Sequence, residues 1–177
     1  LTMAGHNKWS QLKHKKAKTD AQKSKQFSKF SRLITDEVRK AKGNKDAAGV
    51  RTAIERARGV NMPNDAIERA IKKATESAQG LETITYESYG PGGCALIIEA
   101  LTSNKNKAAQ EVKHILSDNG FSLASPGSAS WAFEKKGAEW IATSTVSLED
   151  ADLAILEKLV DDLENNDEVQ EVFTNVE

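Results

Sequence analysis

The spacing of apolar residues predicts that the first part of the chain is helical. From residue 19 to about residue 42, apolar side chains follow one another by three, four and four positions, which is the spacing of one helix face: Phe27, Phe30, Ile34 and Val38. Thr19 is a suitable N-cap for this helix, and Gly43-Asn44 is a suitable end. The other face of the predicted helix is cationic.

Two further amphipathic helices are predicted after it. Residues 46–59 carry one apolar face, and the segment Asn61-Met62-Pro63-Asn64 interrupts the pattern because proline does not continue a helix interior. Asp65 and Glu68 have the spacing of a capping box, with Asp in place of Ser or Thr, at the start of a third helix. Three such helices with short connections predict a helical domain over residues 1–78, followed by a hinge at Gln79-Gly80.

The second half of the chain changes to mixed periods. Alternating and continuous apolar runs of strand length predict strands, and runs with a three-to-four spacing predict helices. In chain order these are strands 83–88 and 94–101, helix 106–119 ending at Gly120, strands 130–135 and 139–142, a helix capped by Ser147, and strand 169–175. Trp131 and Phe133 are expected on one face of their strand. This order predicts an α+β domain over residues 79–177, with the helices on one face of an antiparallel sheet.

The charge of the chain is divided between its two halves. The net charge is −1, but residues 1–73 carry +12 and residues 74–177 carry −13. Such asymmetry is typical of a basic binding module joined to an acidic body, and nucleic acid is the usual partner of the basic part. No apolar run reaches the roughly 20 residues of a membrane span. The single cysteine, Cys94, excludes an internal disulfide and is expected to be a small buried thiol.

The most basic stretch lies between residues 5 and 40, where lysines are interleaved with rings. A solvated cationic face is the ordinary interpretation of such a run, but the rings and the scarcity of acids favour contact with nucleic acid. The candidate nucleic-acid-binding residues are His6, Lys8, Trp9, Lys13, His14, Lys15, Lys16, Lys18, Lys23 and Lys25.

Catalytic and metal sites are not predicted. The loop Gly90-Pro91-Gly92-Gly93 is followed by a strand, whereas a phosphate-binding loop leads directly into a helix, so a turn between strands is expected. No serine, cysteine or histidine lies in a recognisable nucleophile motif, and the three histidines and Cys94 lack the spacing of a zinc site. The acids after Glu149 fall on the polar side of a helix. Binding is therefore favoured over catalysis.

Several short segments, in the same order along almost the whole chain, resemble the YebC family, whose members include the mitochondrial translational activator of cytochrome oxidase subunit one. The segments are Ala4-Gly5-His6-Asn7-Lys8-Trp9-Ser10, Lys13-His14-Lys15-Lys16, Asn61-Met62-Pro63, Tyr86-Glu87-Ser88-Tyr89-Gly90-Pro91-Gly92-Gly93, Lys135-Lys136-Gly137 and Asp167-Glu168-Val169-Gln170-Glu171-Val172.

The resemblance implies a helical N-terminal domain and two α+β domains, one inserted in the other, with no cofactor and no established enzymatic activity. It implies either a translation factor that acts on the ribosome or a DNA-binding transcriptional regulator. A basic arm with stacking rings suits irregular ribosomal RNA, with tRNA and mRNA as further RNA partners, so a ribosome-associated translational activator is our first hypothesis and DNA binding is the alternative. We expect a monomer.

One departure from the family concerns the inserted domain. In the family a further domain lies between the segments matching Lys135-Lys136-Gly137 and Ala138-Glu139-Trp140-Ile141, whereas here Gly137 runs directly into Ala138. The residues before Met3 and the identity of Asn7 lead us to expect a mitochondrial matrix protein, with the bacterial cytoplasm as the alternative. Leu1-Thr2 is either a presequence remnant or an added segment.

Overall fold

A computed structural model describes residues 9, 12, 18–76 and 80–177, which form two compact units. Residues 18–82 form a helical unit, and residues 83–177 form an α+β unit whose core also contains Trp9 and Leu12. The α+β architecture after a helical domain is as predicted. The predicted assignment of residues 1–78 to one domain is not followed at its start, because Trp9 and Leu12 pack with the second unit.

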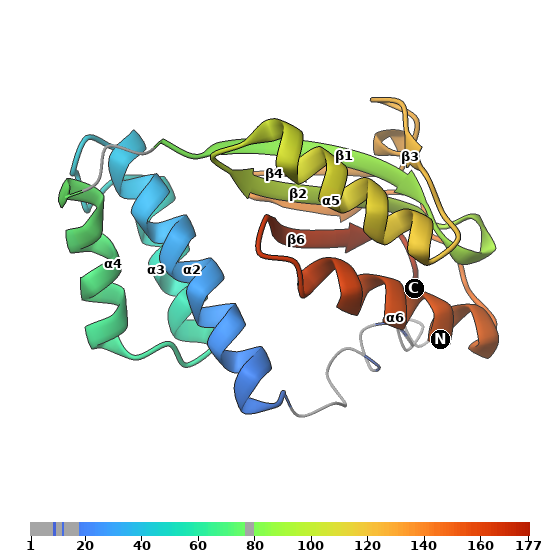
Figure 1. Ribbon diagram of the computed structural model, residues 1–177, viewed down its shortest axis with the longest axis horizontal. Coiled ribbons are helices and arrows are strands. Elements are labelled where there is room, and N and C mark those ends of the chain that lie inside the picture. Colours follow the sequence, from blue (N-terminus) through green and yellow to red (C-terminus); the bar gives the residue numbers. More distant parts are fainter. Residues whose placement is uncertain (1–8, 10–11, 13–17, 77–79) are drawn as a thin grey trace, which may run out of the picture. The chain divides into compact units, whose positions relative to one another are not determined.

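The helical unit contains α2 (Asp20–Lys40), α3 (Ala48–Gly59) and α4 (Asn64–Glu76), shown in blue and green in Figure 1. The predicted N-cap is confirmed: the Thr19 hydroxyl accepts from the Gln22 amide at 3.2 Å, and the Gln22 side chain accepts from the Thr19 amide at 2.9 Å. The predicted apolar face is buried with side chains of α3 and α4. Alanines at Ala53, Ala57 and Ala70 are buried in this core.

Two helices of this unit end in the same way, with a residue in the left-handed region that is not glycine. Lys42 has φ 53° and Asn61 has φ 63°. After α2 the Gly43 amide donates to the Val38 carbonyl at 2.9 Å, and after α3 the Met62 amide donates to the Ala57 carbonyl at 3.0 Å. These are Schellman ends. Helix α2 ends at Lys40, two residues before the predicted Lys42, and the predicted stop residue Gly43 closes the turn by donating to Val38.

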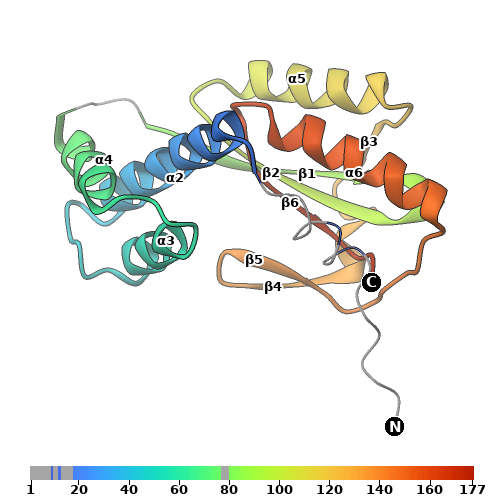
Figure 2. The ribbon, with the colours of Figure 1, turned by 90° about the horizontal axis from the view of Figure 1, so that it is seen from below.

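The α+β unit is built on a four-stranded sheet with the strand order β3-β1-β2-β6. Its strands are β1 (Glu82–Tyr89), β2 (Ala95–Thr102), β3 (Leu123–Ala124) and β6 (Val169–Thr174), and β3 and β6 run antiparallel to their neighbours. Helices α5 (Lys105–Asp118) and α6 (Asp150–Glu164) cover one face, as predicted. A separate hairpin of β4 (Phe133–Lys136) and β5 (Glu139–Ala142) covers the other, as Figure 2 shows.

Strand β2 is buried on both faces, which explains its continuous apolar sequence. Leu96 and Ile98 pack with the helices, whereas Ala95 and Ile97 pack with Phe133 beside the hairpin. The hairpin closes at Gly137-Ala138, where Gly137 has φ 61° and Lys136 pairs with Glu139. The chain therefore forms a tight turn at the position where the resemblance to the family leads us to expect an inserted domain.

Three local predictions are wrong, each because a different local contact replaces the expected one. Ser130–Ala132 is a 3-10 turn, so Phe133 is buried but Trp131 is 62% exposed instead of sharing its face. Helix α6 begins after Glu149, and the Ser147 hydroxyl bonds to the Glu177 carboxylate instead of capping it. Asp65 accepts from Arg69 at 2.9 Å, and α4 already begins at Asn64.

No helix of the described part of the chain is long and apolar enough to cross a bilayer.

Candidate nucleic-acid interface

The described part of the chain includes four of the ten predicted binding residues: Trp9, Lys18, Lys23 and Lys25. Lys18 and Lys23 are exposed beside the first turn of α2, and Lys25 is half-buried one turn further on. The other six candidates lie outside the described residues: His6, Lys8, Lys13, His14, Lys15 and Lys16. Their assignment to nucleic-acid binding stays a prediction.

Trp9 does not lie where a stacking ring is needed. Its side chain is only 7% exposed and belongs to the apolar core of the α+β unit, together with Leu148 and Val176. Its backbone amide faces the carbonyl of Glu177 at 3.4 Å. A base cannot stack on a ring whose faces are already covered by protein, so the prediction for Trp9 is corrected: it is an anchor in the core.

The helical unit has exposed cations beyond those singled out from the sequence. They are found around all three helices and their connections: Lys40, Lys42, Lys45, Arg51, Arg58, Arg69, Lys72 and Lys73. Sequence reasoning gave most weight to the lysine-dense segment before Phe27. The polar positions of the second and third amphipathic helices already contained this information, since positions away from the apolar stripe face solvent.

Some cations of the helical unit also form contacts within the unit. The Lys40 ammonium lies 2.7 Å from Asp36, whose carboxylate is nearly buried. Burial alone would lower the pKa of Lys40, but the hydrogen bond and charge of Asp36 outweigh burial and raise it. Arg69 pairs with Asp65 on the same helix face, and the Arg56 guanidinium lies 5.7 Å from the centre of the Phe30 ring. These three cations therefore also support the fold.

A hydrogen bond between helices fixes the scaffold that carries the cations. The buried Thr35 hydroxyl donates to the Ala70 carbonyl at 2.9 Å and so joins α2 to α4. Because Ala70 and Ile71 are buried against α2, the neighbouring Lys72 and Lys73 are turned to solvent at fixed positions. The cations thus stand on a packed three-helix platform.

The charges of the two units differ in sign. Residues 18–82 contain 15 Lys and Arg against 9 Asp and Glu, a net charge of +6, whereas residues 83–177 contain 6 against 17, a net charge of −11. A polyanion is attracted to the first unit and repelled by most of the second. This contrast makes the helical unit the candidate for a nucleic-acid interface.

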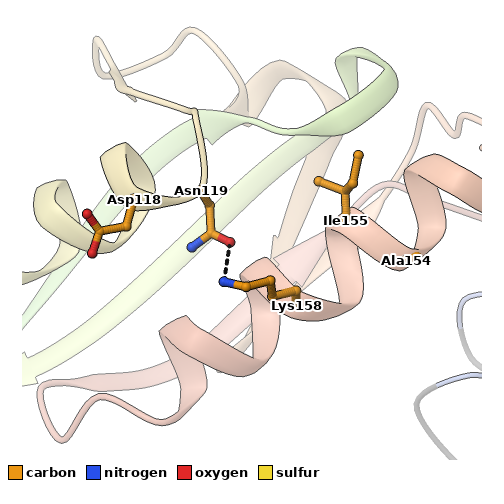
Figure 3. A pocket seen from close by; sticks show the side chains of 5 residues that line it. All are labelled: Asp118, Asn119, Ala154, Ile155 and Lys158. Atoms are coloured by element: carbon orange, nitrogen blue, oxygen red, sulfur yellow. Dashed lines mark hydrogen bonds between the residues drawn. The ribbon is translucent and has the colours of Figure 1, made fainter.

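A second candidate site is a hollow in the α+β unit. The hollow, of about 430 Å³, lies between the end of α5 and α6. Figure 3 shows the side chains that line it: Asp118, Asn119, Ala154, Ile155 and Lys158. Its polar groups already have partners within the protein: the Lys158 ammonium donates to Asn119 at 3.2 Å and to Asp162 at 2.7 Å, and Asp118 lies 3.2 Å from His114. In the part of the chain that the structure describes, no three acids, histidines or cysteines are grouped for a metal ion.

Comparison with known proteins places this architecture in a family. The profile described as the TACO1/YebC protein N-terminal domain matches residues 7–77, and the profile described as the TACO1/YebC second and third domain matches residues 81–139. The chain belongs to the TACO1/YebC family. The resemblance inferred from its short segments is thereby confirmed.

Relatives from bacteria are similar over nearly the whole chain. A protein of Fervidobacterium nodosum is 48% identical over 171 residues, covering 94% of this chain and 68% of its own length. A protein of Nitratiruptor is 49% identical over 177 residues, covering 98% of this chain and 74% of its own length. Both are named probable transcriptional regulatory proteins. These names describe regulators rather than enzymes, and their bacterial sources give the mitochondrial prediction no support.

A solved structure shares the fold. The crystal structure of a conserved hypothetical protein from Aquifex aeolicus matches with a TM-score of 0.79 and 31% identity, covering 96% of both chains. A helical unit followed by an α+β unit is therefore an arrangement that a solved protein of similar sequence also has.

Proposed function

We propose that this chain of the TACO1/YebC family is a non-enzymatic regulator of gene expression that binds nucleic-acid phosphates through its basic segment and helical unit. The observation that supports the proposal is the charge contrast between units, +6 in residues 18–82 against −11 in residues 83–177. Exposed lysines and arginines on a packed platform neutralise phosphates and release counterions, which supplies affinity with little dependence on base sequence.

The composition of the basic surface supports RNA of the ribosome as the target. At the start of α2 the exposed cations are lysines, which act as point charges and do not form the bidentate pairs with guanine that arginine forms. Ribosomal RNA offers phosphates in many orientations, so contacts of this kind suffice there. In this reading the protein is a translational activator that docks on the ribosome.

A second candidate is a DNA-binding transcriptional regulator, and the names of the bacterial relatives favour it. The exposed arginines Arg51 and Arg58 on α3 have the side chains that pair with base edges. Because the relatives are bacterial, we propose the bacterial cytoplasm as the location in either case.

A direct comparison of the two targets tests the proposal. The full chain is mixed with purified bacterial ribosomes or with promoter DNA in excess competitor DNA, and a Lys18→Ala, Lys23→Ala variant is compared with a Lys113→Ala, Lys136→Ala control. The control also removes two exposed lysines, but from the acidic unit. We expect co-sedimentation with ribosomes that is weakened by salt and by the first variant only.

Two results would change the conclusion. A promoter-specific footprint that survives competitor DNA, without co-sedimentation with ribosomes, would establish the transcriptional alternative. Equal weakening by both variants, or binding that is indifferent to salt, would contradict the assignment of the interface to the helical unit.

A further inference from the structure

The most exposed large apolar side chain in the described residues is Trp131, at 62%, and it stands in a loop that is firmly held. The buried Glu87 carboxylate at the end of β1 accepts from the backbone amides of Gly127 at 2.6 Å, Ala129 at 3.0 Å and Ser130 at 2.6 Å. Burial raises the pKa of Glu87, but the three amide donors outweigh it, so the pKa is lowered overall. The loop is therefore fixed to the sheet by an ionised carboxylate.

A second ring completes this arrangement. The Trp131 indole N–H donates to the Tyr89 hydroxyl at 3.0 Å, and the Tyr89 hydroxyl in turn donates to the Ser128 carbonyl. The polar group of the indole is thus already satisfied within the protein. What Trp131 offers to solvent is its ring, held in one orientation before any ligand arrives.

Apart from the buried Glu87 carboxylate, the segments around Trp131 contain little charge, although the unit as a whole is strongly acidic. Residues 88–98, 119–133 and 140–148 contain no Asp, Glu, Lys or Arg. The structure joins these three segments, because Ser88 pairs with Leu123 and the Thr143 amide donates to the Ala132 carbonyl at 2.8 Å. A nucleic acid can approach this part of the α+β unit with less repulsion than elsewhere on the unit.

We propose that Trp131, supported by Tyr89, is a stacking platform for one unpaired base of the nucleic acid that the chain binds. Every base has a ring face, so an exposed aromatic ring binds bases without demanding a sequence, as single-strand-binding proteins do. This inference rests on the proposed function. It assigns a nucleic-acid contact to the α+β unit, although the negative charge of that unit, taken alone, would exclude such a contact.

A protein partner is the less favoured occupant. A stable protein interface buries roughly 800 Å² on each partner, and two rings supply only part of this. Of the other large exposed apolar side chains of the described residues, Ile155 lies on α6. Ile141 lies on β5, in the uncharged segment 140–148, and adds only one further apolar side chain. A single base, by contrast, needs no more than a ring of the size of indole.

The test separates binding to bases from binding to phosphates. Affinities of the full chain are measured for an oligouridine and for an oligomer of the same length whose sugars carry no bases, using wild type, Trp131→Ala, Trp131→Phe and the control Ile155→Ala. Stacking contributes about 1–3 kcal/mol per base, so Trp131→Ala should weaken oligouridine binding about 5- to 150-fold. It should leave binding of the abasic oligomer unchanged, while Trp131→Phe should retain most of the affinity and Ile155→Ala all of it.

Fluorescence supplies a second readout. Trp9 is buried and Trp140 is half-buried with its N–H bonded to Glu99, so Trp131 is the exposed indole of the three. Oligouridine, but not the abasic oligomer, should quench the emission, and Trp131→Phe should remove that quenching.

The outcomes distinguish this inference from the proposed function. Salt-dependent binding of both oligomers that Trp131→Ala does not alter would overturn the stacking platform and leave the proposed function standing. Failure of wild type to bind either oligomer would overturn both. Self-association of wild type that Trp131→Ala abolishes, with nucleic-acid binding unchanged, would assign the ring to a protein interface and also overturn the proposal.

Discussion

Replacing Trp9 by alanine should unfold the α+β unit more easily, because the structure places this ring in its core. A tryptophan that is only 7% exposed has most of its surface removed from water. Burying about 150–250 Å² at about 25 cal/mol per Å² corresponds to about 4–6 kcal/mol. An alanine side chain still buries part of this surface, so we expect the free energy of unfolding to fall by about 3–5 kcal/mol, as for other large aromatic side chains in cores.

Urea unfolding followed by tryptophan fluorescence measures this loss of stability in the α+β unit specifically. The chain has three tryptophans and none lies in residues 18–82, so the emission of the variant reports the α+β unit through Trp131 and Trp140. Hydrogen exchange of α2, α3 and α4 should change much less. Trp131→Ala is the matched control: the same chemical change at a 62% exposed position should cost less than about 1 kcal/mol.

The opposite pattern would refute the reasoning. If Trp9→Ala left the unfolding free energy within about 0.5 kcal/mol of wild type and reduced RNA affinity without changing its dependence on salt, Trp9 would be a stacking ring after all. The assignment of the ring to the α+β core would then be wrong.

Four further predictions concern the two ends of α2, the buried carboxylate and the cysteine. Thr19→Ala removes the N-cap of α2 and should destabilise the helical unit by about 1 kcal/mol. Lys42→Gly should stabilise the unit by about 0.5–1 kcal/mol because Lys42 has φ 53°. Thermal melting measures both effects, and an unchanged melting temperature in either variant would contradict the role given to that residue. Glu87→Gln should cost about 2–3 kcal/mol near neutral pH. The folded-state pKa of Glu87 lies below its ordinary 4.5, so the stability that the carboxylate contributes is present above pH 4.5 and is lost as the pH falls through the lower, folded-state pKa. Urea titrations at a series of pH values should therefore show a difference between wild type and variant that shrinks in acid. Burial raises the pKa of Cys94 to about 11, so alkylation at pH 8 should proceed only as fast as the protein opens, and rapid labelling of the native chain would contradict this.

Much of the fold was predictable because apolar periodicity determines which faces must be buried. The stripe of α2, the apolar face of α6 and the continuous run of β2 all lie in cores as expected. The two-residue strand β3 was missed, since a segment so short has no period. The different surroundings of Trp131 and Phe133 were missed for another reason: a 3-10 turn breaks the alternation that the sequence pattern assumes.

The candidate site was less predictable from the sequence because charge and ring type do not reveal burial. Trp9 lies among lysines, which suggested a ligand-facing ring, yet the core that covers it is contributed by residues such as Leu148 and Val176, far along the chain. Glu87 gives a similar lesson. It sits in an alternating strand like any surface acid, and only the return of the 127–130 loop turns it into a buried anchor.

The dependence of nucleic-acid affinity on salt tests the central claim most directly. Single-stranded RNA binding is titrated over a range of salt concentrations for wild type and for the variant with Lys13, Lys15, Lys16 and Lys18 all changed to Ala. If each lysine neutralises a phosphate, the slope of log affinity against log salt becomes shallower by about 0.7 per lysine, while thermal stability changes by no more than about 0.5 kcal/mol per site. An unaltered slope, or a variant that no longer folds, would show that these lysines do not form the nucleic-acid interface.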